Sequence, residues 1–206
     1  MAEPGKLVLI DGHALVYRAY FALPPTMRTA QGELTNAVFG FASMLLRVLE
    51  EQHPEYLAVT FDVGRTFRHD DYAEYKANRA EMPDDLSMQF ARIDQLLEAF
   101  AIPSYSAENY EADDVLAALA EQAEKEGLQT LIVTGDTDTF QLVGPNVRVM
   151  TPGRSFSDTI VYDEKKIRER YGLEPSQLID YKALVGDTSD NVPGVRGVGD
   201  KTATKL

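Results

Sequence analysis

KLVLIDGHALVYRAYF, at residues 6–21, is an apolar run that ends in an acidic residue and continues into a helical pattern. Its first part, LVLI, is rich in Leu, Val and Ile, which is typical of a strand buried on both faces of a sheet. Asp11 follows this run directly, and a helix is expected over residues 12–21. A buried strand, a carboxylate and a helix in this order are typical of an α/β fold.

The same order recurs at two other places in the chain. YLAVTF comes before Asp62, and TLIVTG comes before Asp136. Ligands of open α/β sheets bind outside the carboxyl ends of the strands, so the three acids are expected at one edge. Like charges cannot share a site unless cations neutralise them, and Mg²⁺ or Mn²⁺ prefers oxygen ligands. The sequence therefore predicts a divalent metal site at this edge.

The rest of the chain alternates in the same way. Strands are expected at residues 6–10, 56–61, 102–105, 129–134, 147–150 and 157–162, and helices at 12–21, 36–51, 84–100, 112–126, 138–143, 163–171 and 175–184. This alternation favours an α/β fold with a parallel, doubly wound sheet. Residues 63–84 have weak periodicity, and we expect a mobile, partly helical segment there.

Three further motifs carry acids. In EADD, at 111–114, Glu111 and Asp114 would share a helix face while Asp113 would not, so a common site requires Glu111 in the loop before the helix. The alternative is favourable charge at a helix N-terminus. In TGDTD, at 134–138, Asp136 and Asp138 would point the same way in an extended loop, or would form an Asx turn with a helix cap.

The third motif is GDTSDNVPG, at residues 186–194. It places Asp187 and Asp190 three apart, on one face of a helical turn, and the alternative is a solvated turn. Each motif is a weak signal alone, because single acids often cap helices. Five acidic groups in one chain favour a common cation site.

Composition limits the class of protein. The 206 residues, of which 44% are hydrophobic, suit one large domain or a domain with a small appendage. Cysteine is absent, which excludes disulfides and Cys-ligated zinc and fits a cytoplasmic location. There is no run of 18 apolar residues, so no membrane helix is expected. The net charge of -13 is concentrated before residue 151, largely in the clustered acids, so it does not exclude nucleic acid.

Two segments favour nucleic acid as the partner. Residues 63–84 interleave bases with aromatics, which suits a single strand, although nearby acids also allow a solvated loop. GVRGVGDKTA, at 194–203, lacks the Walker spacing but fits a helix-hairpin-helix, in which backbone N–H groups hold a DNA phosphate. The three histidines, His13, His53 and His69, have no metal-ligand spacing and are expected to be surface or packing residues.

Taken in order, seven motifs resemble the 5′-nuclease (flap endonuclease) superfamily, and most closely the 5′→3′ exonuclease domain at the N-terminus of bacterial DNA polymerase I. They are IDG (10–12), FD (61–62), YKANR (75–79), EADD (111–114), TGDTD (134–138), GDTSDNVPG (186–194) and GVGDKTA (197–203). The resemblance implies a PIN-like, mostly parallel sheet flanked by helices over residues 1–171, with a helical arch at about 63–84. It also implies a helix-hairpin-helix at 172–206, incomplete because the chain stops inside the second hairpin helix.

The resemblance also implies an activity and its residues. The activity is metal-dependent 5′→3′ exonuclease or flap endonuclease cleavage of DNA in replication and repair, by a two-metal mechanism. One Mg²⁺ or Mn²⁺ would lie among Asp11, Asp62, Glu111 and Asp113, with Asp114 nearby, and a second among Asp136, Asp138, Asp187 and Asp190. Lys76 and Arg79 match arch residues that contact the scissile phosphate, and Tyr75 matches an aromatic that stacks on a nucleotide. Thr137 departs from many relatives, which have Lys or Arg there.

With the basic loop and the hairpin, the candidate DNA-binding residues are Arg18, Arg65, Arg68, Tyr75, Lys76, Arg79, Gly197, Gly199, Lys201 and Thr202. The resemblance implies K⁺ bound by the main chain of Leu184, Val185, Pro193, Val195 and Val198. The implied partner is DNA with a 5′ flap or a 5′ end at a duplex junction, with a DNA polymerase domain as a further candidate. No membrane association is expected. The protein is expected to be a monomer.

Two other functions stay open. One is a DNA-junction-binding module without catalysis, which the nine retained carboxylates disfavour because a pure binder gains nothing from their repulsion. The other is a PIN-type ribonuclease, which the arch segment and the hairpin disfavour.

Overall fold

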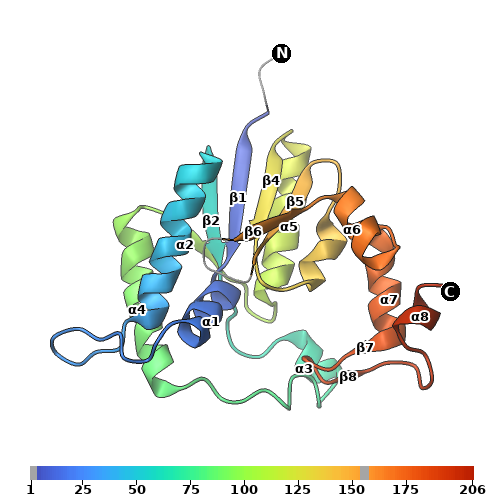
Figure 1. Ribbon diagram of the computed structural model, residues 1–206, viewed down its shortest axis with the longest axis horizontal. Helices are drawn as coiled ribbons and strands as arrows, with labels where there is room; N and C mark the ends of the chain where they lie inside the picture. The colour runs from blue at the N-terminus through green and yellow to red at the C-terminus, as the bar shows by residue number, and fades with distance from the viewer. Residues whose placement is uncertain (1–3, 154–157) are drawn as a thin grey trace.

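Six strands form one sheet at the centre of the computed structural model, which describes residues 4–153 and 158–206 (Figure 1). They are β1 (Lys6–Asp11), β2 (Tyr56–Thr60), β3 (Ser104–Tyr105), β4 (Gln129–Val133), β5 (Val147–Pro152) and β6 (Thr159–Tyr162). Their spatial order is β3-β2-β1-β4-β5-β6. All neighbouring pairs are parallel except β5 with β6, which is antiparallel. The expected α/β fold is confirmed as a mixed, mostly parallel sheet flanked by helices.

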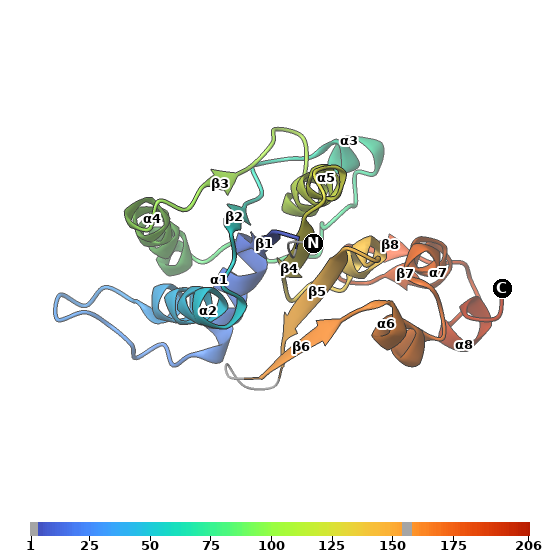
Figure 2. The same cartoon turned by 90° about the horizontal axis from the view of Figure 1, so that it is seen from above.

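Helices cover both faces of this sheet (Figure 2). The helical elements are α1 (Gly12–Ala22), α2 (Asn36–Gln52), α3 (Phe67–Asp71), α4 (Asp84–Ala99), α5 (Ala112–Lys125), η1 (Asp138–Leu142), α6 (Glu164–Tyr171), η2 (Pro175–Gln177), α7 (Leu178–Val185) and α8 (Asp200–Ala203). A core on one face joins Val8 and Ile10 to α1, α2 and α4, and a core on the other joins Leu9 to α5 and α6. Successive strand residues point to opposite faces, so a strand covered on both faces is apolar throughout.

The parallel strands bring their carboxyl ends to one edge, at the bottom of Figure 1. Asp11 lies opposite Thr60 in the register of β1 with β2, and Ile10 lies opposite Val133 of β4. Asp62 and Asp136 each follow within three residues of these strand ends. The expected elements agree with the structure to within a few residues, except that position 157, the expected start of β6, lies outside the described residues.

Residues 186–194 differ from the expected helical turn. They form a small antiparallel hairpin of β7 (Gly186–Asp187) and β8 (Val192–Pro193). Gly186 has φ +83° and ends α7, and a Cβ there would lie 2.3 Å from the Gly194 nitrogen. Asn191 also has a left-handed φ, of 58°, at the turn. These two conformations break the helix and fold the chain back on itself.

Residues 63–84 contain one short helix, α3, and a series of turns. The turns lie against the β7–β8 hairpin through backbone and side-chain hydrogen bonds. Lys76 N–H donates to the Asp190 carbonyl (2.9 Å), and Asn191 Nδ2 donates to the Glu74 carbonyl (2.8 Å). The segment is therefore fastened to the C-terminal part of the chain.

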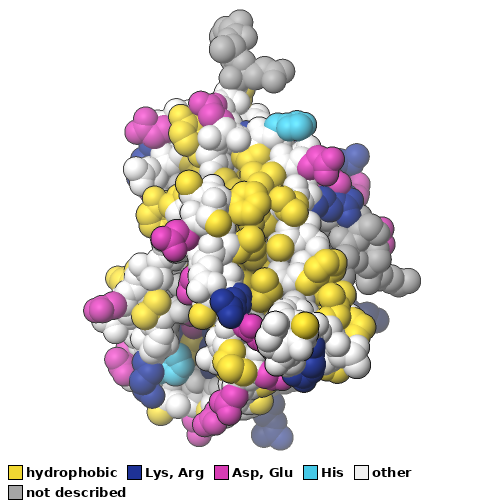
Figure 3. All heavy atoms as spheres, turned by 90° about the vertical axis from the view of Figure 1, so that its left-hand side faces the viewer, with side chains coloured by type: hydrophobic (Ala, Val, Ile, Leu, Met, Phe, Trp, Pro, Cys, Tyr) yellow, Lys and Arg dark blue, Asp and Glu magenta, His cyan; other side chains and the backbone are white. Residues whose placement is uncertain are grey.

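The side of the molecule that carries α2 and α4 has a different surface. Hydrophobic side chains gather there (Figure 3), and Phe39, Leu46 and Met88 are among the exposed ones. Among the described residues, no helix combines the length and apolar character needed to cross a membrane. The acids Asp11, Asp62 and Asp136 lie at or just beyond the carboxyl ends of their strands instead.

Candidate active site

Asp11 ends β1 and is buried, with 5% of its surface exposed. Its Oδ1 accepts the Ala14 N–H (3.0 Å) and so caps α1, and its Oδ2 accepts the Thr134 hydroxyl (2.7 Å). Burial raises the pKa of Asp11 to about 6, although both hydrogen bonds oppose this. Asp11 is therefore both a helix cap and a carboxylate that resists ionisation without a nearby cation.

Asp62 lies just beyond β2, beside the N-terminus of α5. Its Oδ1 accepts the Ala112 N–H (2.6 Å), and its own N–H donates to His13 Nδ1 (3.1 Å). The His13 ring packs against Phe61 and Phe90, with centroid separations of 5.6 Å and 5.0 Å. Burial lowers the pKa of His13. We expected His13 to be a surface or packing residue, and no spacing in the sequence indicates its contact with Asp62.

Glu111 and Asp114 form the N-terminal cap of α5. Glu111 lies just before the helix, as a common site required, and its N–H donates to Asp114 (2.9 Å). The two oxygens of Asp114 also accept from the Arg68 guanidinium (2.7 and 2.8 Å), and this hydrogen bonding lowers the pKa of Asp114. Arg68, expected to contact DNA, is thus paired with an acid and joins α3 to α5.

Asp113 stands among the other acids. Burial, and then the charges of Asp11, Asp136, Asp62 and Glu111, raise its pKa well above the ordinary value. Its carboxylate forms no hydrogen bond or ion pair with any residue that the structure describes. An oxygen ligand in this position suits a hard divalent cation.

Asp136 and Asp138 realise the Asx turn that was the alternative for their motif. Asp136 Oδ1 accepts the Asp138 N–H (2.9 Å), and Asp138 begins η1. Burial raises the pKa of Asp136, while the charge of Lys182 lowers it. The turn does not remove these acids from the edge, because both line a small cavity with Asp113 and Asp190.

Lys182, in α7, links Asp138 to Asp187. Its amine is hydrogen-bonded to Asp138 and lies 2.7 Å from Asp187 Oδ2. Although burial raises the pKa of Asp187, hydrogen bonds from Lys182 and Ser189 lower it below its ordinary value. No motif in the sequence marks Lys182, because a single lysine within a helix is a common solvated residue.

The arch segment places its cations among the acids as well. The Lys76 amine lies 2.6 Å from Glu111 and 3.8 Å from Asp190, and Arg79 Nη2 lies 2.5 Å from Asp190. The Tyr75 hydroxyl lies 3.0 Å from Glu111 and 2.8 Å from Asp190. Tyr75 is only 8% exposed, so stacking of its ring on a nucleotide stays a prediction and would require this side chain to move.

The positively charged side chains of Lys76, Arg79 and Lys182 affect how closely the acids can approach one another. Within residues 4–153 and 158–206, no three Asp, Glu, His or Cys side chains are arranged so that they could hold a metal ion together. Lys76, Arg79 and Lys182 lie between the carboxylates instead. The oxygen-only donors and the unpartnered Asp113 fit Mg²⁺ or Mn²⁺, provided that these side chains move aside.

Two cavities adjoin the acids. The larger, of about 720 Å³, has Asp11, Asp62 and Asp113 on one wall and Tyr17, Phe21, Met82 and Pro83 among its apolar lining, with Lys76 and Arg79 also lining it. The smaller, of about 190 Å³, contains Asp136, Asp138 and Asp190. A cavity of the larger size can hold a nucleotide-sized group, with a charged end and an apolar end.

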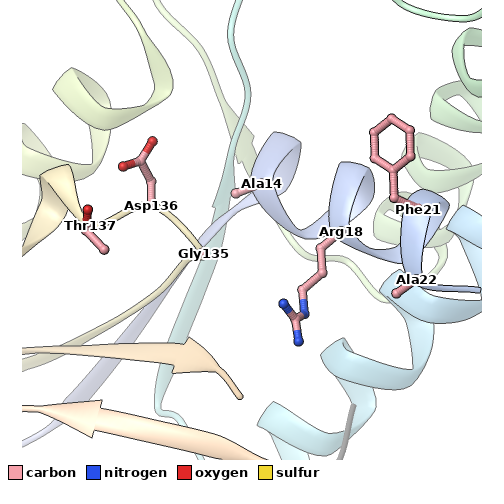
Figure 4. A pocket seen from close by; sticks show the side chains of 7 residues that line it. All are labelled: Ala14, Arg18, Phe21, Ala22, Gly135, Asp136 and Thr137. Atoms are coloured by element: carbon pink, nitrogen blue, oxygen red, sulfur yellow. The ribbon is translucent and has the colours of Figure 1, made fainter. Parts of the chain in front are cut away.

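Arg18, in α1, lines an open recess beside the larger cavity, with Phe21 and Asp136 (Figure 4). Its guanidinium donates to the Gly153 carbonyl, and its Nε is buried without a partner among the described residues. Arg65, in contrast, is exposed at the start of the arch segment and lies 3.6 Å from Asp70. Arg18 thus lines the same recess as Asp136, whereas Arg65 pairs with Asp70, an acid outside both expected metal sets.

The C-terminal hairpin region is assembled by close backbone contacts. The Leu184 carbonyl accepts the Val195 N–H (2.8 Å), and the Val195 carbonyl accepts the Val198 N–H (3.0 Å). Pro193 pairs with Gly186, next to Val185. The structure therefore brings together the five residues expected to bind K⁺. Gly197 has φ +86°, Gly199 caps α8, and Lys201 and Thr202 are exposed on that helix.

Comparison with protein-family models divides the chain into two matches. Residues 6–172 match the 5′–3′ exonuclease, N-terminal resolvase-like domain. Residues 173–206 match the 5′–3′ exonuclease, C-terminal SAM fold.

Two curated relatives are DNA polymerases I. The chain is 56% identical to DNA polymerase I of Chloroflexus aurantiacus, with 100% of this chain and 22% of the relative covered. It is 46% identical to that of Bacillus subtilis, with 100% of this chain and 23% of the relative covered. The chain thus spans less than a quarter of the length of these relatives.

Solved structures with the same fold include two nucleases. One is bacteriophage T5 flap endonuclease, in a pseudo-enzyme-product complex with DNA and metal ions, at 22% identity and a TM-score of 0.77, covering 97% of this chain and 73% of that one. Another is flap endonuclease-1 from Methanococcus jannaschii, at 20% identity and a TM-score of 0.60, covering 98% and 70%. At these identities the likeness concerns the fold.

Proposed function

This chain belongs to the 5′–3′ exonuclease family, and on that premise we propose that it hydrolyses DNA phosphodiesters at 5′ ends and 5′ flaps in replication and repair. The observation that carries the proposal is the unpartnered Asp113, set among Asp11, Asp62, Glu111 and Asp136 beside a cavity of about 720 Å³. Such a set of acids requires cations, and the cavity has room for the substrate's reacting end.

The proposed cofactors are two Mg²⁺ or Mn²⁺ ions. Asp11, Asp62, Glu111 and Asp113 would hold one, and Asp136, Asp138, Asp187 and Asp190 the other. Asp114 is left out of both sets, because Arg68 and the Glu111 N–H already occupy its oxygens. When bound, such ions supply an activated water and neutralise charge on the leaving oxygen.

Side chains of the protein itself would handle the substrate's charge. Lys76 and Arg79 pair with Glu111 and Asp190 and also line the large cavity, and cations that neutralise those acids would leave both side chains available to the substrate. Their positive charges would then stabilise the scissile phosphate as negative charge develops on it. The apolar wall with Tyr17 and Phe21 would exclude water from the adjoining nucleotide.

The proposed substrate is DNA with a 5′ flap or a 5′ end at a duplex junction. The exposed Lys201 and Thr202, beside Gly199 at the start of α8, suit contact with a duplex phosphate, and K⁺ at residues 184–198 would brace this region. Arg18 would contact DNA from the recess near Asp136. A DNA polymerase domain is the proposed partner, because the relatives are DNA polymerases I.

The proposal is tested with a 5′-flap DNA labelled at the flap, incubated with Mg²⁺, Mn²⁺ or EDTA. Metal-dependent release of short 5′ products, leaving a 5′-phosphate and a 3′-hydroxyl, is the expected result. Binding in Ca²⁺ without cleavage in Mg²⁺ or Mn²⁺ would instead identify a junction-binding module. A preference for RNA over the DNA flap would identify a ribonuclease.

Replacing Asp136 by Ala is expected to abolish metal-dependent cleavage, because this acid belongs to the proposed second metal set. The matched control is Asp94→Ala, since Asp94 is an exposed acid on α4, and it should leave the rate unchanged. Cleavage by the Asp136 variant at the parent rate would refute the assignment.

A further inference from the structure

His13 is the second residue of α1, and its ring lines the larger cavity. The ring is fixed on several sides. It stacks near Tyr17, at 6.4 Å between centroids, and packs against Phe61 and Phe90. A ring held in this way presents its two nitrogens in constant directions, so the partner of each nitrogen shows what the residue does.

The Asp62 N–H donates to His13 Nδ1 at 3.1 Å. A ring nitrogen that accepts a hydrogen bond carries no proton, so the ring proton must be on Nε2. Among the described residues, none forms a hydrogen bond with Nε2. The hydrogen bond from the Asp62 N–H therefore fixes the tautomer, and the same Nδ1 lies 3.7 Å from Oδ2 of Asp62.

This hydrogen bond fixes the backbone of Asp62 just beyond the last backbone hydrogen bond between β2 and its neighbours. The ladder of β2 ends at Thr60, and the Phe61 N–H still donates to the Tyr105 carbonyl of β3 (3.0 Å). The next amide, that of Asp62, has only His13 as its acceptor among the described residues. At the other end of the same residue, Oδ1 accepts the Ala112 N–H (2.6 Å).

We propose that His13 is a positioning residue, which fixes the Asp62 carboxylate for metal binding by accepting the Asp62 N–H at Nδ1. With the backbone held by His13 and Oδ1 held by Ala112, the remaining oxygen, Oδ2, is directed by two fixed points. The inference rests on the proposed function, because it is there that Asp62 holds a metal.

Three substitutions of His13 distinguish a role of Nδ1 from a role of Nε2. In His13→Asn the amide oxygen can occupy the place of Nδ1, in His13→Gln it reaches only the place of Nε2, and in His13→Leu neither place has an acceptor. The measurement is Mn²⁺ binding to the DNA-free protein by titration calorimetry. Loss of a partner behind a metal ligand commonly costs about 10–100-fold in metal affinity. We expect a loss of about tenfold in the Gln and Leu variants, and a smaller loss in the Asn variant.

Other roles for His13 predict a different ranking of the three variants by Mn²⁺ affinity. If Gln preserves Mn²⁺ binding and Asn does not, His13 acts through Nε2 toward the cavity, and the proposal is wrong. If all three variants bind equally, the ring serves packing alone, and the proposal is also wrong.

A second measurement does not depend on the variants' folding. The ¹⁵N NMR shifts of His13 in the parent protein report its tautomer, and a proton on Nδ1 would contradict the proposal. Failure of the proposed function itself would look different, since the parent protein would then neither bind Mn²⁺ nor cleave a flap. Thermal unfolding of each variant controls for loss of structure.

Discussion

Asp11 has a pKa raised from 3.8 to about 6, mainly by burial. The folded protein therefore binds this proton more tightly than the unfolded chain does. Its contribution to stability is present below pH 3.8 and is lost as the pH rises through about 6. A shift of this size corresponds to roughly 3 kcal/mol, since one pKa unit is about 1.4 kcal/mol.

In EDTA, Asp11→Asn is therefore expected to be more stable than the parent at pH 8, by up to roughly 3 kcal/mol, and to lose this advantage near pH 4. The asparagine remains neutral and can still accept the Ala14 N–H. Urea unfolding at several pH values measures the difference. Excess Mn²⁺ should reverse the order at pH 8, because the ionised acid is the form that would hold the metal.

The control for this experiment is Asp94→Asn, at an exposed position on α4. Its difference from the parent should change little with pH. A stability difference for Asp11→Asn that is the same at pH 4 and pH 8 would contradict the burial argument.

Individual residues differed in how far the sequence could identify them. The strand-end acids Asp11 and Asp62 were predictable, because an acid directly after a buried parallel strand lies at the edge where such sheets bind ligands. His13 and Lys182 were not, because their roles depend on partners 49 and 44 residues away in the chain. Asp114 was grouped with the metal acids by the resemblance of its motif. Only the structure shows that Arg68 donates hydrogen bonds to both of its carboxylate oxygens.

At the scale of elements, the arch segment and the β7–β8 hairpin form one joined unit. Asn78 Nδ2 donates to the Thr188 carbonyl (2.8 Å), and Asn191 Nδ2 donates to the Glu74 carbonyl (2.8 Å). Lys76 and Asn191 both have left-handed φ angles, of 55° and 58°. The two loops thus hold each other in conformations that neither favours alone.

Replacing Asn191 by Gly should loosen the arch segment. Glycine keeps the left-handed conformation but removes the bond to Glu74, which is worth about 1 kcal/mol, or roughly fivefold in the open population. Trypsin should then cleave faster after Lys76 and Arg79 in the DNA-free protein. Limited proteolysis followed by mass spectrometry measures these rates.

Asn146→Ala is the matched control, because its Nδ2 also donates a hydrogen bond, to Glu124, in a loop that precedes β5 and does not belong to the arch. It should leave cleavage at Lys76 and Arg79 unchanged. Equal protection of the arch segment in the Asn191 variant and the parent would show that other contacts fasten the two loops.

Elements with a regular period were predictable and irregular ones were not. The helix at 36–52 and the strand at 129–133 follow apolar patterns and agree with expectation to within about a residue. The hairpin at 186–193 was expected to be a helical turn, because two acids three apart suit either geometry. The deciding factor was the close contact of Gly186 with Gly194, which no local pattern contains.

For the whole molecule, the net charge of -13 and the crowding of acids at the sheet edge lead us to expect a stability that depends on cations. Mn²⁺ is expected to raise the unfolding midpoint more than NaCl of the same ionic strength, since general screening does not replace specific binding. At a concentration of 100 times Kd the gain is about 2.7 kcal/mol. Calorimetry of the parent and of Asp136→Ala checks this, and the variant should gain less.

If NaCl of the same ionic strength stabilises the parent as much as Mn²⁺ does, the edge binds no specific ion. An equal gain in the parent and in Asp136→Ala would place the binding elsewhere on the molecule.

The acids of the candidate site come from positions spread between residues 11 and 190. A chain leaves the ribosome from its N-terminus, so the hairpin that carries Asp187 and Asp190 emerges after every strand of the large sheet. Until then the second set of acids lacks half its members, and the arch segment has no hairpin to fasten it. On the proposed function, a nascent chain has the complete second set of acids only after synthesis has passed about residue 190, so cleavage of DNA by the nascent chain is expected only after that point.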